Sequence, residues 1–223
     1  MQSQPPSLEE GGVDFSRAVI IDSIGLTKPN PAFLEGAREV LVNAGLKVEF
    51  FNGSQVTIRL LDDFGGYGLV ILRVHSAIDI KHGFLYLFSA EPYSKDKYLY
   101  EQYYGAYREA YTFDSNEGLY FALRADLLGS EDGLRGSTII LMGCNGTNSE
   151  YAIEKLFEKG AKEIIAWDGY VDLEYTDKVA LKLLRLVYEE GLSFSEAVQR
   201  VMDVMGPDPI WGSRLAYLDN PEV

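Results

Sequence analysis

Four short apolar runs restrict the fold of this chain more than any other feature. They cover residues 17–22, 68–75, 137–142 and 162–167. Each run is too short for a core helix and shows little polar alternation, which is typical of strands buried on both faces of a parallel sheet. Helix patterns alternate with them over residues 32–43, 55–64, 150–159, 173–189 and 193–205. The alternation predicts an α/β fold, a three-layer sandwich with a largely parallel central sheet.

Weaker patterns complete the expected set of elements. Residues 46–51 alternate enough for a strand near the sheet edge, and residues 214–218 form a plausible last strand. Residues 83–88 are expected to pair in a hairpin with residues 119–123, and the intervening residues 89–118 are expected to be mobile. Eight of the fifteen tyrosines fall between Tyr93 and Tyr120, where they either cover a sheet edge or form an aromatic wall for a peptide.

Length and charge limit the classes of protein to consider. A chain of 223 residues fits one domain, here expected over residues 17–223 after a disordered or linker segment over residues 1–16. The net charge of −14 argues against binding to nucleic acid or to an anionic membrane surface. No apolar stretch is long enough to span a membrane and no signal-peptide pattern opens the sequence, so we expect a cytoplasmic protein with no membrane partner.

Two chemically active side chains follow two of the buried runs. Cys144, the only cysteine, ends one run, and His75 ends another. If the two strands are parallel neighbours, thiol and imidazole emerge at the same edge of the sheet, where ligands bind in open α/β folds. A thiol needs such a base because only the thiolate is nucleophilic. The alternative is that both are ordinary core residues, and spacing alone favours neither interpretation.

The motifs around these two residues resemble a known family. Leu69-Val-Ile-Leu-Arg-Val-His75-Ser76 and Ile139-Ile-Leu-Met-Gly-Cys144-Asn-Gly-Thr resemble the strand ends of caspase-like cysteine peptidases, the clan of caspases, gingipains, clostripain and separase. Residues 157–167, 171–172 and 190–197 are most similar to CHAT domains, as is Leu134-Arg-Gly136. The resemblance covers roughly residues 17–205.

The resemblance implies a cysteine endopeptidase acting on peptide or protein substrates without a cofactor. Cys144 would be the nucleophile, His75 would assist it and protonate the leaving amine, and the N–H groups of Ser76 and Cys144 would hold the oxyanion. The family usually has Gly where this chain has Ser76, which motivates an alternative: a catalytically inactive module that binds peptides or assembles with partners.

A basic specificity pocket is the last expectation. Asp22 ends the first strand at the same edge, and Asp168 and Asp172 follow the fifth, with Trp167 as a possible wall. In the Arg- and Lys-specific relatives an acidic residue receives the substrate side chain, so cleavage after Arg or Lys is expected; the alternative is that Asp22 caps its loop.

Other assignments fit the sequence less well. His82 is expected on the surface, and two histidines and one cysteine without ligand spacing indicate no metal site. A glutamine amidotransferase would require a catalytic His after the Cys, and no His follows His82. A flavodoxin-like nucleotide site would require a glycine-rich loop after the first strand, where the sequence has none.

Overall fold

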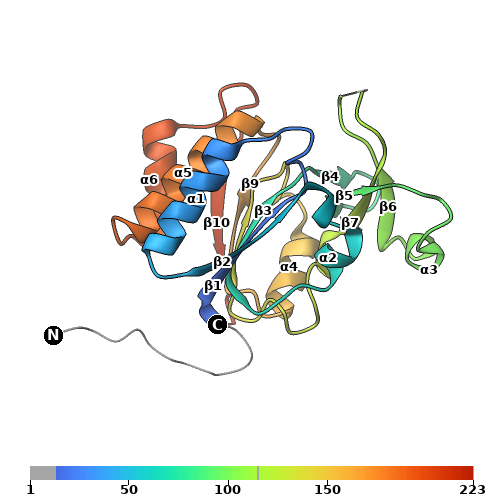
Figure 1. The fold of residues 1–223 in the computed structure, drawn as a ribbon, viewed down its shortest axis with the longest axis horizontal. Coiled ribbons are helices and arrows are strands. Elements are labelled where there is room, and N and C mark those ends of the chain that lie inside the picture. The colour runs from blue at the N-terminus through green and yellow to red at the C-terminus, as the bar shows by residue number, and fades with distance from the viewer. Residues whose placement is uncertain (1–13, 115, 223) are drawn as a thin grey trace.

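A six-stranded sheet forms the centre of the molecule (Figure 1). The computed structural model describes residues 14–114 and 116–222. The strands of this sheet, in the spatial order β10-β9-β8-β3-β1-β2, are β1 (Asp14–Asp22), β2 (Lys47–Asn52), β3 (Tyr67–Arg73), β8 (Thr138–Leu141), β9 (Glu163–Trp167) and β10 (Leu215–Asp219). All neighbours run parallel except β10, which is antiparallel to β9. The predicted, largely parallel central sheet is therefore confirmed.

A second, antiparallel sheet lies beside the first. Its spatial order is β4-β5-β7-β6, with β4 (Ser76–Asp79), β5 (Phe84–Pro92), β6 (Tyr107–Ala110) and β7 (Tyr120–Arg124). The predicted pairing of residues 83–88 with 119–123 is confirmed, since Leu87 lies opposite Leu123. The two strands are not a simple hairpin, because β6 lies between them in sequence and pairs with the far side of β7. The sequence did not predict the four-residue strands β4 and β6, because each carries charged residues in too short a run. The mobility of residues 89–118 stays a prediction.

Local sequence signals explain where the longer helices begin. The helices are α1 (Pro31–Asn43), α2 (Ile58–Asp62), α3 (Leu99–Tyr103), α4 (Glu150–Glu158), α5 (Leu173–Tyr188) and α6 (Phe194–Met205). Asn30, Ser149 and Ser193 accept a hydrogen bond from a backbone N–H in the first turn of α1, α4 and α6. The helix expected over residues 55–64 is shorter in the structure, because Thr57 caps α2 and residues 53–55 form a separate 3-10 turn.

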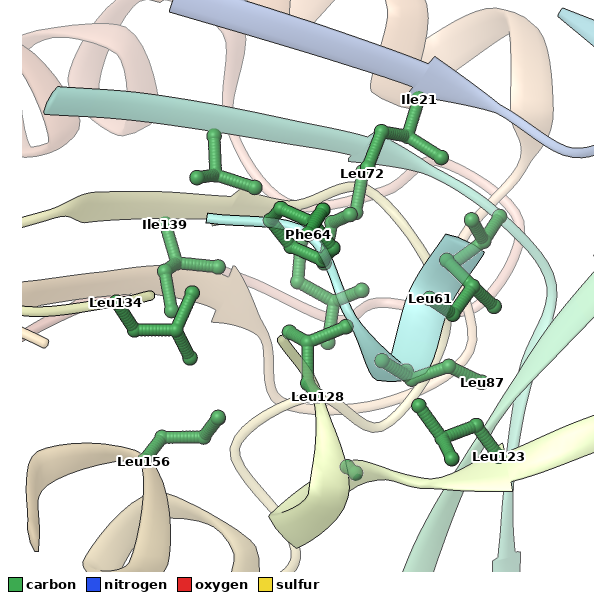
Figure 2. Packing of buried hydrophobic residues seen from close by; sticks show 14 of the residues in the cluster. Ile21, Leu61, Phe64, Leu72, Leu87, Leu123, Leu128, Leu134, Ile139 and Leu156 are labelled. Atoms are coloured by element: carbon green, nitrogen blue, oxygen red, sulfur yellow. The ribbon is translucent and has the colours of Figure 1, made fainter. Parts of the chain in front are cut away.

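The central sheet is buried on both faces. On one face lie α1, α5 and α6 (Figure 1), and their apolar residues pack with Ala18 and Ile20 of β1. On the other lie α2, α4 and the second sheet, packed against Val19 and Ile21; Figure 2 shows Ile21 among the side chains of this core. Alternate residues of β1 thus point into two different cores, which is why its sequence is a continuous apolar run. The arrangement is an α/β sandwich of three layers.

The chain before the first strand needs one correction. Residues 14–16, expected in a linker, belong to β1; the rest of that expected linker, residues 1–13, lies outside the described residues. Across residues 14–114 and 116–222, no helix combines the length and the apolar character that a membrane crossing requires.

Candidate functional site

The strands that precede His75 and Cys144 are adjacent and parallel. Leu72 of β3 lies opposite Leu141 of β8, and the N–H of Met142 donates to the carbonyl oxygen of Leu72 (2.9 Å). His75 and Cys144 each follow this registered pair by three residues. The prediction that thiol and imidazole leave the sheet at the same edge is confirmed.

One cavity of about 320 Å³ contains both side chains. The sheet ends supply His75, Ser76 and Cys144. The other walls come from the loop between β1 and α1, from the β6–β7 loop (residues 111–114 and 116–119), and from the segment after β9. Its full lining consists of Lys28, His75, Ser76, Ala77, Phe88, Tyr111, Thr112, Phe113, Asp114, Glu117, Cys144 and Tyr170.

His75 is half-buried in the cavity and is not fixed by a hydrogen bond at Nε2. This nitrogen is buried and has no partner in the described part of the chain, and the ring meets Phe88 edge-on at 6.1 Å between centroids. Burial lowers the pKa of His75, since it disfavours the imidazolium; Glu117 opposes this shift, and the positive charges of Lys28 and Arg73 add to it. At neutral pH the imidazole is therefore uncharged and can accept a proton.

Cys144 is also half-buried, and its thiol has a backbone acceptor. The Sγ–H group donates a weak hydrogen bond to the carbonyl oxygen of Val171 (3.9 Å). Burial raises the pKa of Cys144, the bond to Val171 opposes this, and the charge of Asp208 adds to it. The resting pair thus consists of a neutral thiol and a neutral imidazole, without a hydrogen bond between them.

The turn that carries Cys144 packs closely against the start of β4. The hydroxyl of Ser76 donates to the carbonyl oxygen of Cys144 (2.6 Å). A Cβ at Gly143 would lie 2.3 Å from this hydroxyl oxygen and 2.7 Å from the carbonyl oxygen of Val74, so only glycine allows the approach. On its other side, Asn145 adopts a left-handed conformation (φ 58°) and donates its N–H to the carbonyl oxygen of Gly169 (2.8 Å).

Two backbone amides belong to residues that line the cavity, those of Ser76 and Cys144. The N–H of Phe88 donates to the carbonyl oxygen of His75 (2.8 Å), so these two residues occupy a hydrogen-bonded position of the β4–β5 ladder. Such positions alternate in antiparallel sheets, and the N–H of Ser76 therefore points away from β5. The N–H of Cys144 has no acceptor among residues 14–114 and 116–222.

An ion cluster joins the β6–β7 loop to the body of the protein. Nζ of Lys28 lies 3.1 Å from Asp114 Oδ2 and 3.4 Å from Glu117 Oε1. Asp114 is partly exposed, whereas the side chain of Glu117 is only 6% exposed. These three charged residues lie at the cavity, and none of them was predicted as a site residue. The tyrosine-rich composition was the only signal for this region, and it is Tyr111 that lines the cavity.

The structure does not bring Asp22 to the cavity. Its side chain is fully buried, and Oδ1 accepts a hydrogen bond from Arg73 Nη1 (3.0 Å). Arg73 in turn donates two hydrogen bonds to Asp177, at 2.8 and 2.9 Å. Burial raises the pKa of Asp22 even though Arg73 favours its charged form. The expected substrate-binding role is corrected: Asp22 belongs to an internal ion network.

The other expected pocket residues also lie outside the cavity lining. Trp167 is fully buried and donates from Nε1 to Thr176 (2.9 Å). Asp168 accepts a hydrogen bond from the N–H of Arg214 (2.7 Å), and Asp172 caps α5. Each of the three has a structural partner, and none lines the cavity that holds His75 and Cys144, so the expected substrate-binding role is not supported there.

The second histidine, His82, lies outside the cavity lining. His82 is exposed, as predicted, with Nδ1 2.7 Å from Asp79 Oδ2. Within the described ranges, no group of three or more His, Cys, Asp or Glu side chains is placed to hold a metal ion.

Comparison with protein-family models found no match, and comparison with the curated proteins found none either. The functional argument therefore rests on the geometry of the cavity.

Proposed function

We propose that the chain is a cysteine endopeptidase of the caspase-like type, with Cys144 as nucleophile and His75 as its base. One observation carries the proposal: the only thiol of the chain and a half-buried, neutral imidazole line one cavity, at the carboxyl ends of two adjacent parallel strands. The carboxyl edge of such a sheet is the usual place for a ligand site. The motif resemblance and the three-layer α/β sandwich add support.

The proposed reaction is acyl transfer. His75 takes the proton of the thiol, and the sulfur of Cys144 attacks the peptide carbonyl, whose oxygen becomes an oxyanion. The amides of Ser76 and Cys144 donate to this oxyanion; losing one such donor typically costs about 10²–10³ in rate. The C–N bond breaks as His75 returns the proton to the leaving amine, and water then hydrolyses the thioester. For this transfer the thiol must give up its weak hydrogen bond to Val171 and donate to His75 instead.

A preference for cleavage after Arg or Lys remains part of the proposal, on a different basis. Asp114 is the partly exposed acidic side chain at the cavity, and its present partner is the ammonium of Lys28. A basic substrate side chain would replace Lys28 there, in a charge-assisted hydrogen bond. Fluorogenic peptides that differ only before the scissile bond test this preference. Equal or faster cleavage after Leu or Asp would rule it out.

A peptidyl aldehyde or chloromethyl ketone tests the enzyme assignment directly. Stoichiometric labelling of Cys144, lost in His75→Ala and retained in His82→Ala, supports a peptidase. Hydrolysis of a peptide library by the native chain and not by Cys144→Ala completes the test. Turnover at the native rate in Cys144→Ala would show that the nucleophile is wrongly assigned.

A second candidate is an inactive peptide-binding module of the same fold. The observation that favours it is the resting state of Cys144, whose pKa is raised by burial and whose thiol donates to Val171. A module of this kind would bind peptides in the cavity but hydrolyse none, and the labelling of Cys144 would not depend on His75. The labelling experiment separates the two candidates.

A further inference from the structure

Within residues 14–114 and 116–222, two buried polar atoms of the same cavity have no hydrogen-bond partner. One is Nε2 of His75 and the other is Oε1 of Glu117. An unsatisfied buried polar atom is costly and is found where function or a ligand requires it. The two groups are chemically complementary, because a carboxylate accepts the hydrogen bond that an imidazolium donates.

The carboxylate of Glu117 is buried and held by one neighbouring hydroxyl. Its side chain is 6% exposed, and Thr112 donates to its second oxygen, Oε2 (3.2 Å). The remaining oxygen, Oε1, lies 3.4 Å from the ammonium of Lys28, which lies closer to Asp114. One carboxylate oxygen is thus anchored, and the other makes only this longer ion pair.

Three charged residues from three segments influence His75. Glu117 comes from the β6–β7 loop, Lys28 from the loop between β1 and α1, and Arg73 from β3. Glu117 is the one that favours a protonated imidazole, whereas Lys28 and Arg73 oppose it. The thiol of Cys144 shares the cavity.

We propose that Glu117 is a positioning residue for His75, because its carboxylate stabilises the imidazolium formed when the imidazole takes the proton of Cys144. The inference rests on the proposed function and deepens it. In the step concerned, the S–H bond of Cys144 breaks, its electron pair stays on sulfur, and the proton forms an N–H bond on His75. The neutral pair becomes a thiolate and an imidazolium, and Glu117 lowers the free energy of the second ion.

An NMR titration of the full-length chain tests the inference without any turnover. The chain has two histidines, so the ring signals of His75 and His82 can both be followed, and exposed His82 is an internal control. In Glu117→Gln, the pKa of His75 should fall by about one unit, since an opposite charge nearby typically shifts a pKa by that amount or more. The rate of Cys144 alkylation by iodoacetamide at pH 7 should fall about tenfold, because one pKa unit is a factor of ten in the ion-pair population.

Two further variants keep the test decisive. Lys28→Met should raise the pKa of His75, the opposite sign to Glu117→Gln, whereas loss of structure alone would not produce opposite shifts. Asp114→Asn removes the other acidic partner of Lys28 and should change the His75 pKa much less. An unchanged pKa in folded Glu117→Gln overturns the inference; if that variant does not fold, the absence of a rise in Lys28→Met does so.

The outcome also separates this inference from the proposed function. If the pKa of His75 shifts in Glu117→Gln and Lys28→Met but the chain hydrolyses no peptide, the role of Glu117 toward His75 holds and the peptidase assignment fails. If the chain hydrolyses peptides but the pKa of His75 is unchanged in Glu117→Gln, the peptidase assignment holds and the role of Glu117 is rejected.

Discussion

The hydroxyl of Ser76 donates a 2.6 Å hydrogen bond to the carbonyl oxygen of Cys144. Ser76 begins β4, and Cys144 lies in the turn after β8, so this bond ties the second sheet to the turn that carries the only thiol. The residue that departs from the expected Gly pattern therefore has a structural partner at the candidate site itself.

Ser76→Ala should lower the free energy of unfolding by about 1 kcal/mol, because the partly buried carbonyl of Cys144 loses its donor. Urea unfolding monitored by circular dichroism measures this. Ser54 is exposed and makes no side-chain hydrogen bond within the described residues, so Ser54→Ala is a matched control that should stay within about 0.5 kcal/mol. Equal losses in the two variants would mean that the Ser76–Cys144 bond contributes nothing.

Gly143→Ala should destabilise the chain by about 1–3 kcal/mol, the usual cost of overpacking. Its Cβ would lie 2.7 Å from the backbone oxygen of Val74, which cannot move as a side chain can. The control is Gly118→Ala, where a Cβ meets no atom within 4 Å. Thermal unfolding of both variants decides the matter: a Gly143→Ala variant as stable as the control would contradict the close packing.

Alkylation of Cys144 should be slow at pH 7 and should accelerate as the pH rises past the ordinary thiol range. Burial raises the pKa of this thiol, so the reactive thiolate appears only at higher pH. Iodoacetamide labelling followed by mass spectrometry across pH 6–10 gives the profile, with free cysteine as reference. A plateau already reached near pH 7 would show instead that the thiolate–imidazolium pair exists in the resting protein.

Arg73→Met should cost about 3–5 kcal/mol of unfolding free energy at pH 7, because Asp22 and Asp177 would remain buried without their cation. Unpaired buried carboxylates have raised pKa values in the folded state. The protonated carboxyls stabilise the folded variant at low pH, and this stabilisation is lost as the pH rises. The loss of unfolding free energy in Arg73→Met should therefore be smaller at pH 4 than at pH 7.

The exposed pair of Arg17 with Glu49 supplies the control for that prediction. Arg17→Met removes a cation of the same kind at the surface and should cost at most about 1 kcal/mol. An Arg73→Met deficit as small as this one, or one that grows toward low pH, would contradict the burial of the network.

Much of the fold could be predicted because its signals are local. The apolar runs of β1, β3, β8 and β9 and the caps at Asn30 and Ser193 act over a few neighbouring residues. The positions of His75 and Cys144 at strand ends are equally local. They lie at one edge because β3 and β8 are adjacent and parallel, so the carboxyl ends of the two strands are side by side.

The sequence alone therefore determined the layered α/β architecture and the pair of residues at its edge, because periodicity and turn signals are properties of short segments. Tertiary structure decided which charges face the cavity. Asp22 was expected there, but Arg73, on the neighbouring strand, holds it inside the protein, and Asp177, 104 residues further along the chain, completes the network. Lys28 and Asp114, 86 residues apart, meet at the cavity instead. A charge can be buried only where a partner offsets its desolvation cost. Which residue is that partner depends on the packing of segments far apart in the sequence, and local sequence patterns do not contain this information.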